Sequence, residues 1–560
     1  MVLSRFFRLE STGIHQAAFL LALSSIANTV FALFRDRLLA GSFGASRVLD
    51  IYYAAFRLPD MLFSLSLFFV ASTAFIPLYL EYQGKSPESA RRFFGSVITL
   101  FLGAIVVLLC IAFLALPVLI PRIVPGFSKE EQETTRLLSS IMLFSPLFLG
   151  LSSIVSGVVQ SSKRFLSYAL APIAYNGGII LGVLVFLPVF GASGLALGVV
   201  MGAFFHLVVQ IPTLIRLRVF PRARFTLDSE SLQIIWYSFP RAAALSVNQL
   251  TLMVLTALAS TLGAGSIAIF NLSQNLYALP LTVIGLSYSV AAFPTMAELA
   301  IKKDRLLFFQ HLVSATRHVL FWTIPITGLF FVFRAHIVRL VLGTGAFAWV
   351  DTHLTIASLF LFSFAIMAQS LVTLFVRAFY ALGKTREPIL FNIISAVATI
   401  FLAFGVVSII QKNVASEAFF AAVFRVRLEN VSGAGVAFLG LPLAFSFGAL
   451  LNALLLGMSL FSMNGKETAR AVYRSGGKIT LAATGMSLAA YATRQALGPY
   501  FPLDTVAQVV IHASLSLGVA LLVGYYLLRW LEVREFFEFR DAIHARFKKR
   551  EVLQPEVERL

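Results

Sequence analysis

The sequence predicts an all-α polytopic membrane protein. Of its 560 residues, 59% are hydrophobic and only 12% are charged, whereas a soluble protein carries about 25% charged residues. The mean hydropathy is +0.87, and apolar runs of about 20 residues, long enough to cross a bilayer as helices, recur along the chain. The alternating segments of about ten residues that are typical of an outer-membrane barrel do not occur.

These runs predict fourteen transmembrane helices, here called spans. In chain order they cover residues 14–34, 51–82, 93–120, 135–160, 166–190, 193–215, 233–262, 266–299, 306–333, 352–382, 388–410, 433–463, 478–497 and 505–530. The second span is interrupted by Pro59 and Pro77. Membrane helices tolerate such prolines because neighbouring groups satisfy the backbone that they release.

Lysine and arginine gather in every second loop, and this bias predicts that those loops are cytoplasmic. The cytoplasmic set begins with Arg5 and Arg8 and continues through Lys302, Lys303 and Arg305 to the basic tail. On the opposite side, which we call the far side, the loops 191–192 and 263–265 contain no charge. Both termini are therefore predicted to be cytoplasmic. We assign the net charge of +18 to orientation and expect no nucleic acid as a partner.

A basic stretch at 216–224 divides the spans into six and eight. The expected domains are an N-terminal six-span lobe (1–217), a basic cytoplasmic linker (218–232), a second six-span lobe (233–463), two additional spans (464–531) and a basic tail (532–560). Phe75-Ile76-Pro77 and Phe293-Pro294, each followed by a glutamate, end corresponding spans. Paired proline-interrupted spans are typical of transporters that alternate access, although membrane helices also tolerate proline without such a role.

Motifs for nucleotide binding, zinc proteolysis and serine hydrolysis are absent from the sequence. The eight histidines show no pair at ligand spacing, and the single Cys110 excludes an intrachain disulfide. We therefore expect no catalytic residue, no metal and no cofactor. The energy for transport would come from an ion gradient, the membrane potential or the gradient of the substrate.

Four charged residues lie where one apolar span ends or inside the next: Arg35, Asp50, Arg57 and Asp60. Charge at membrane depth costs roughly 2.5–3.5 kcal/mol per residue on insertion scales, so a polar cavity is expected to receive them. Arg35 would bind an anionic headgroup or anchor the end of its span. Asp50 would pair with Arg35 or Arg57, or cap the helix that begins at Ile51. Arg57 and Asp60, three residues apart, would bind substrate or neutralise each other.

Short motifs follow one another through most of the chain. They include Arg35-Asp36, Phe43-Gly44, Asp50, Ala55-Phe56-Arg57-Leu58-Pro59, Ala74-Phe75-Ile76-Pro77, Pro125-Gly126-Phe127, Ser246-Val247, Phe293-Pro294 and Gly345-Ala346-Phe347. In this order and spacing they resemble the MurJ/MviN family, the lipid II flippases of the multidrug/oligosaccharidyl-lipid/polysaccharide exporter superfamily.

This resemblance implies a flippase that moves lipid II, the undecaprenyl-pyrophosphate-linked peptidoglycan precursor, from the cytoplasmic to the periplasmic leaflet. It implies two six-span lobes in a V around a cationic cavity, and a groove for the lipid tail supplied by spans thirteen and fourteen. The partners would be lipid II or a similar polyprenyl-pyrophosphate lipid, the bilayer and cell-wall synthesis proteins. Arg35, Asp36, Asp50 and Arg57 would form the substrate site, since a pyrophosphate crossing a bilayer needs counter-charges.

The chain departs from the family at several positions where members usually carry a charge. Thr29, Phe63 and Phe68 occupy three of them, and Gln274 and Asn275 lie near the place of a span-eight arginine. We expect Gln274 and Asn275 to line the substrate site, or to join helices as intramembrane amides usually do.

Leu255 and Lys384 stand where some members bind sodium through carboxylates. We hypothesise that the Lys384 ammonium replaces this ion and acts in coupling or gating. Three functions stay open from the sequence: a lipid II flippase with a reduced cationic site, driven by the membrane potential; a paralogue that exports another polyprenyl-linked saccharide or amphipathic lipid; and a membrane scaffold of the same fold that transports nothing.

Overall fold

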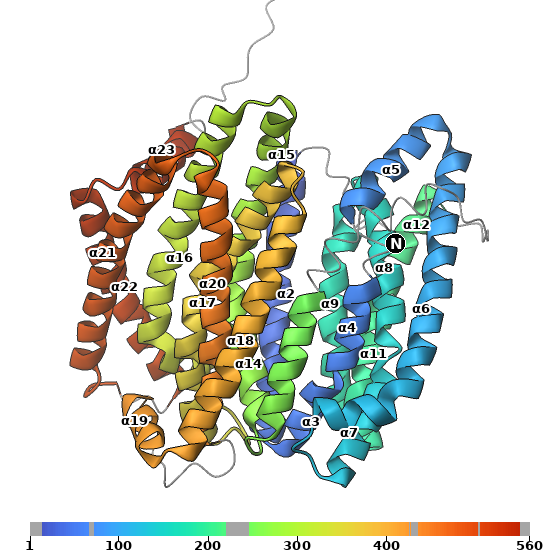
Figure 1. Cartoon of the computed structure of the whole chain (residues 1–560), viewed down its shortest axis with the longest axis horizontal. Coiled ribbons are helices and arrows are strands. Elements are labelled where there is room, and N and C mark those ends of the chain that lie inside the picture. Colours follow the sequence, from blue (N-terminus) through green and yellow to red (C-terminus); the bar gives the residue numbers. More distant parts are fainter. Residues whose placement is uncertain are drawn as a thin grey trace, which may run out of the picture. The chain divides into compact units, whose positions relative to one another are not determined.

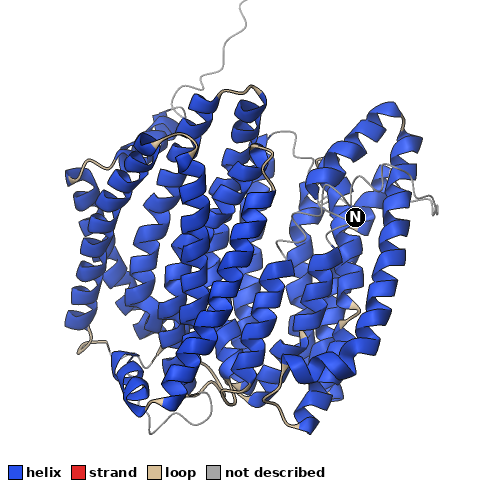
Figure 2. Ribbon diagram, in the orientation of Figure 1, coloured by secondary structure: helices blue, strands red, loops and turns tan. Residues whose placement is uncertain are grey.

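The computed structural model describes residues 14–66, 72–219, 246–424, 426, 435–501 and 505–548. Every regular element among them is a helix (Figure 2). Ten helical stretches are long and apolar enough to cross a membrane within this described part of the chain. The all-α polytopic class is therefore confirmed, whereas the number of fourteen spans stays a prediction.

The chain forms two compact units, which we describe separately. The first unit comprises Met1–Leu272, Val341–Thr355 and Asn392–Ala444. Its helices (Figure 1) are α2 (Ile14–Phe43), α3 (Arg47–Ala55), α4 (Arg57–Ser66), α5 (Ser72–Lys85), α6 (Pro87–Ile123), α7 (Lys129–Met142), α8 (Ser145–Ser161), α9 (Phe165–Leu181), η2 (Gly182–Phe186), α10 (Leu187–Phe190), α11 (Ala192–Val208), α12 (Ile211–Leu217), the helix Ser246–Ser260, α19 (Val414–Phe424) and η5 (Val436–Leu439).

The second unit comprises Ser273–Leu340, Ile356–Phe391 and Phe445–Leu560. It contains η3 (Leu281–Leu286), α15 (Ser287–Ile301), α16 (Arg305–Val341), α21 (Lys466–Leu497), α22 (Val506–Trp530) and α23 (Arg534–Lys548). The last residue of α16, Val341, belongs to the first unit, and four further helices are divided between the units: α14 (Ser266–Pro280), α17 (Trp349–Ala381), α18 (Arg386–Lys412) and α20 (Gly440–Ser462). The domain boundaries expected from the sequence stay a prediction, and most of the expected linker lies outside the described residues.

The first helices are divided differently from the expected spans. Helix α2 continues to Phe43, so Arg35 lies inside the helix and not at its end. The expected second span is divided into α3, α4 and α5, with Ser46 in the N-cap position of α3. Pro59 lies in the first turn of α4, where a missing N–H costs little because it would have no intrahelical acceptor.

Small residues set the spacing of α9 and α11 in the first unit. A Cβ atom added to Gly178 would lie 2.2 Å from the Cα of Gly202, and one added to Gly198 would lie 2.5 Å from the Cα of Gly182. Only glycine permits this backbone approach, as in other close-packed membrane helices. Helix α2 also packs against α9, so the position of Asn176 on α9 is fixed between α2 and α11.

The second unit is held at one end by a buried ion pair. Glu535 of α23 is 1% exposed and binds Arg317 of α16. The Ser475 hydroxyl of α21 donates to the same carboxylate at 2.8 Å. Lys478 adds a hydrogen bond of 2.7 Å to the carbonyl of Leu531. The tail helix α23 is therefore attached to the transmembrane helices rather than detached in solvent.

Candidate functional site

Arg35 is held by three acceptor contacts within the first unit. Its Nε and Nη2 donate to Oδ1 of Asp36 at 2.9 and 2.7 Å, and its Nη1 donates to Oδ1 of Asn176 at 2.9 Å. The Asn176 amide in turn donates to Oδ1 of Asn28 at 3.0 Å. Arg35 therefore forms an ion pair with Asp36 on its own helix and joins α2 to α9 through Asn176. A phosphate at this guanidinium would compete with Asp36.

Asp50 accepts backbone hydrogen bonds from the start of another helix. The N–H groups of Gly265 and Ala268 donate to its two carboxylate oxygens at 2.7 and 2.8 Å. Its only ion pair among the described residues is with Arg47, at 3.6 Å. The predicted pairing with Arg35 or Arg57 was therefore wrong. The predicted capping of its own helix was wrong as well.

The position of Asp50 has a simple electrostatic reason. The first N–H groups of a helix have no intrahelical acceptor, and the helix dipole favours an anion beside them. Asp50, completely buried, supplies this anion to the N-terminus of α14. A local sequence pattern does not reveal this, because Asp50 and Gly265 lie far apart in the chain.

Arg57 reaches two helices that come much later in the sequence. Its Nε donates to Oγ1 of Thr256 at 2.7 Å, and its Nη2 donates to Oδ1 of Asn271 at 2.8 Å. Arg57 is 5% exposed. No ion pair of 4 Å or less joins it to Asp60 among the described residues, but the two charges attract each other over a longer distance. The predicted mutual neutralisation of Arg57 and Asp60 is therefore present only as this longer-range attraction. Sequence reasoning missed Thr256 and Asn271, although an asparagine inside an apolar span was a usable signal.

Backbone contacts complete the same region, and four glycines permit them. Added Cβ atoms would meet a carbonyl oxygen at 2.5 Å (Gly44 with Ala346), 2.2 Å (Gly126 with Ser260), 2.3 Å (Gly265 with Ala45) and 2.3 Å (Gly345 with Gly41). Hydrogen bonds accompany them: Ala346 N–H to Gly41 O at 2.8 Å, Gly126 N–H to Ser260 Oγ at 3.1 Å and Ala45 N–H to Asp351 Oδ2 at 3.1 Å.

We call this region the far-side closure. It consists of residues 41–50, 57, 126, 256–271 and 344–351, all of them in the first unit. Most of these residues lie in or beside loops that the sequence assigns to the far side. The closure brings Asp50 and Arg57 against the same segment, 256–271, whereas Arg35 and Asp36 have partners on α2 and α9.

The remaining predicted site residues belong to the second unit. Gln274 and Asn275 lie on α14 and are half-buried, and the Gln274 side chain is hydrogen-bonded to Tyr277. Lys384 follows α17, is 45% exposed and lies 3.7 Å from Glu387. A role of Lys384 in coupling stays a prediction.

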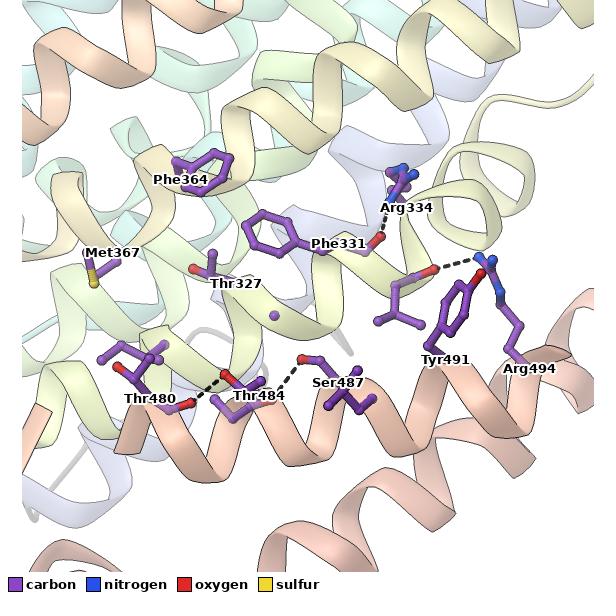
Figure 3. A pocket seen from close by; sticks show the side chains of 15 residues that line it. Thr327, Phe331, Arg334, Phe364, Met367, Thr480, Thr484, Ser487, Tyr491 and Arg494 are labelled. Carbon is purple, nitrogen blue, oxygen red and sulfur yellow. Dashed lines mark hydrogen bonds between the residues drawn. The ribbon is translucent and has the colours of Figure 1, made fainter. Parts of the chain in front are cut away.

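A groove runs along α21 in the second unit (Figure 3). It has a volume of about 560 Å³ and is lined by residues of α16, α17 and α21. A second groove of about 340 Å³ shares Ile324, Met367 and Thr480 with the first. Helix α21 includes the expected thirteenth span. The fourteenth span, α22, does not line either groove in the described residues.

The family model described as "Lipid II flippase MurJ" matches residues 39–510. The chain belongs to the MurJ lipid II flippase family. Its MurJ relatives include the probable lipid II flippase MurJ of Rickettsia prowazekii (strain Madrid E), 26% identical over 394 residues, which cover 68% of this chain and 76% of the relative. The lipid II flippase MurJ of Burkholderia cenocepacia is 23% identical over 446 residues, covering 78% and 81%.

Solved structures show the same fold. A structure described as lipid II flippase MurJ in an inward closed conformation aligns with a TM-score of 0.70 and 23% identity, covering 92% of this chain and 99% of that one. An inward-facing multidrug-resistance MATE transporter of the MOP superfamily aligns with a TM-score of 0.61 and 14% identity, covering 78% and 97%. The predicted MurJ family and multi-pass membrane architecture are therefore confirmed.

Proposed function

We propose that this protein translocates lipid II from the cytoplasmic to the periplasmic leaflet of the inner membrane by alternating access, with both termini in the cytoplasm and without catalysis. Membership of the MurJ family supports the substrate. The observation that carries the mechanism is the far-side closure, in which buried polar groups and glycine contacts join the two halves of the sequence within one unit. A transporter closed on one side must break such contacts to release its cargo there.

When the far side opens, two sets of hydrogen bonds are lost. The Asp50 carboxylate leaves the N–H groups of Gly265 and Ala268, and the Arg57 guanidinium leaves Thr256 and Asn271. Each group is then a charge in a newly opened, hydrated path. The pyrophosphate of the passing lipid is a suitable new partner for Arg57, because guanidinium and phosphate match in geometry and charge.

The grooves along α21 suit the lipid tail. A polyprenyl chain has no polar group to satisfy, so it stays in contact with apolar side chains while the headgroup crosses the polar path.

The departures from the family are the argument for a second candidate, a paralogue for another polyprenyl-linked or amphipathic lipid, which the MurJ relatives and the MurJ structure do not favour. Thr29 and Phe63 provide no charge, and Arg35 is already paired with Asp36. A genome that encodes a second homologue with arginines at the missing positions would favour this candidate.

Rescue of cells depleted of their own lipid II flippase tests the proposal. Expression of this chain should restore growth and cell shape, and Arg35→Ala should abolish rescue because it removes the link between α2 and α9. Arg377→Ala, which changes a residue near the C-terminal end of α17, should still rescue. Failure of the well-expressed, membrane-inserted wild type would count against lipid II as the cargo. If both variants rescued the depleted cells equally well, Arg35 would not be part of the transport path.

A further inference from the structure

Two arginines stand at one end of the groove along α21. In Figure 3, Arg334 of α16 and Arg494 of α21 both lie toward the end opposite Met367 and Thr480. The Arg334 guanidinium lies 5.1 Å from the ring centroid of Phe360. That of Arg494 lies 5.2 Å from the Tyr491 ring and donates to the carbonyl of Val332 at 3.0 Å. These contacts position both positive charges at the groove's end.

The rest of the groove is suited to hydrocarbon. Its lining includes the two arginines and no acidic residue among the described side chains. The hydroxyls of Thr480, Thr484 and Ser487 donate to carbonyls of α21 itself, at 2.8, 2.9 and 2.8 Å. Since these donors are already satisfied, the wall offers methyl and methylene groups to a ligand. A lipid with an anionic head and an apolar chain matches this arrangement.

The length of the two grooves favours a long single chain. Together they follow α21 from Ala469 to Arg494 and α16 from Thr316 to Arg334, which corresponds to about 27–37 Å of helix at 1.5 Å per residue. The hydrocarbon core of a bilayer is about 30 Å thick. The chains of a phospholipid occupy one leaflet, about half of that thickness, and would fill only part of the path. A polyprenyl chain can occupy all of it.

We propose that Arg334 and Arg494 form an exit subsite that binds the pyrophosphate of a polyprenyl lipid after its head has reached the far side, while the chain lies in the groove. The subsite rests on the proposed function, because it assigns the same cargo to a second position. Helices α16 and α21 both end, beyond these arginines, at loops that the sequence assigns to the far side. Two guanidinium groups provide the donors that a pyrophosphate requires.

Binding of undecaprenyl pyrophosphate by the purified full-length protein tests the subsite, with native mass spectrometry as the readout. Arg334→Gln combined with Arg494→Gln should weaken binding at least about tenfold, because charge-assisted hydrogen bonds are lost. The double lysine variant should bind more tightly than the double glutamine variant, because it keeps the charges. Arg470→Gln provides the matched control, since Arg470 is exposed on the same helix and outside both grooves.

Unchanged binding by a double glutamine variant that keeps the wild-type melting temperature would overturn the subsite. The subsite would also be overturned if the double glutamine variant lost only the binding of phosphatidylglycerol, measured in parallel, because that result would identify a phospholipid site. A lipid II flipping assay in liposomes separates the two proposals. If the wild-type protein does not flip lipid II, but its binding of undecaprenyl pyrophosphate depends on the two arginines, the proposed transport function is contradicted and the subsite is supported.

Discussion

Polar side chains serve different purposes in the two units. In the far-side closure, Asp50 and Arg57 are buried, and their partners are groups of distant helices. Along the groove, the hydroxyls of Thr480, Thr484 and Ser487 are bonded to their own helix, and the charges stand at one end. A buried charge with fixed partners holds a conformation, because separation leaves both sides unsatisfied. The partner, rather than the residue type, therefore distinguishes a closing contact from a binding one.

Loss of the Asp50 carboxylate should have the largest effect on the closure. Asp50→Ala leaves the N–H groups of Gly265 and Ala268 without acceptors and should weaken the closed state by about 3 kcal/mol. Ser266 is a suitable reporter position, because it is fully buried and its hydroxyl has no hydrogen-bond partner. In a Cys110→Ala, Ser266→Cys background, labelling by a membrane-impermeant maleimide should accelerate about a hundredfold.

The control for this substitution is Glu81→Ala, which removes an exposed carboxylate paired with Lys85. Its labelling rate should equal that of the parent. If Asp50→Ala also labelled at the parental rate, Asp50 would not hold the far side closed.

A methyl group at Gly126 should act next most strongly. Gly126→Ala places a Cβ atom 2.2 Å from the carbonyl oxygen of Ser260, so the backbones must separate, at a cost of about 2 kcal/mol. The same cysteine reporter should label more than tenfold faster, by about that free energy. Gly103→Ala is the matched control on α6, since nothing lies within 4 Å of its added Cβ atom. Equal rates for both variants would show that the glycine contact does not limit opening.

Coupling between Arg57 and Asn271 should be the smallest of the three effects. A double-mutant cycle of Arg57→Gln and Asn271→Ala should give an interaction energy of about 1.5 kcal/mol, because one charged hydrogen bond joins the pair. Maleimide labelling of the Ser266→Cys reporter supplies the free energies. Strict additivity would mean that the 2.8 Å contact contributes nothing to closure.

Much of the fold was predictable because hydrophobic length and the positive charge of loops are local properties. Apolar runs predicted transmembrane helices, and motif order predicted the MurJ family, before any contact was known. The division of the second span into α3, α4 and α5 was less accessible, since proline alone indicates an interruption but not its form.

The candidate site was predictable only as a set of residue types. The sequence singled out Arg35, Asp36, Asp50 and Arg57 as costly charges that must have partners. For Asp50 and Arg57 it offered charges nearby in the sequence as partners within the protein, because a local pattern supplies no others. Their observed partners, Thr256 and the N–H groups at 265 and 268, are ordinary residues or backbone groups about two hundred positions away.

The sequence by itself determined a helical, multi-pass membrane protein of the MurJ family, and it predicted an unusually small number of cavity charges. Only the tertiary structure decided what those charges bind. A helix N-terminus becomes an anion site only when folding brings a carboxylate to it. Likewise, a glycine becomes part of a closure only when another backbone approaches within contact distance. Such partnerships depend on packing between distant segments, and hydropathy does not encode them locally.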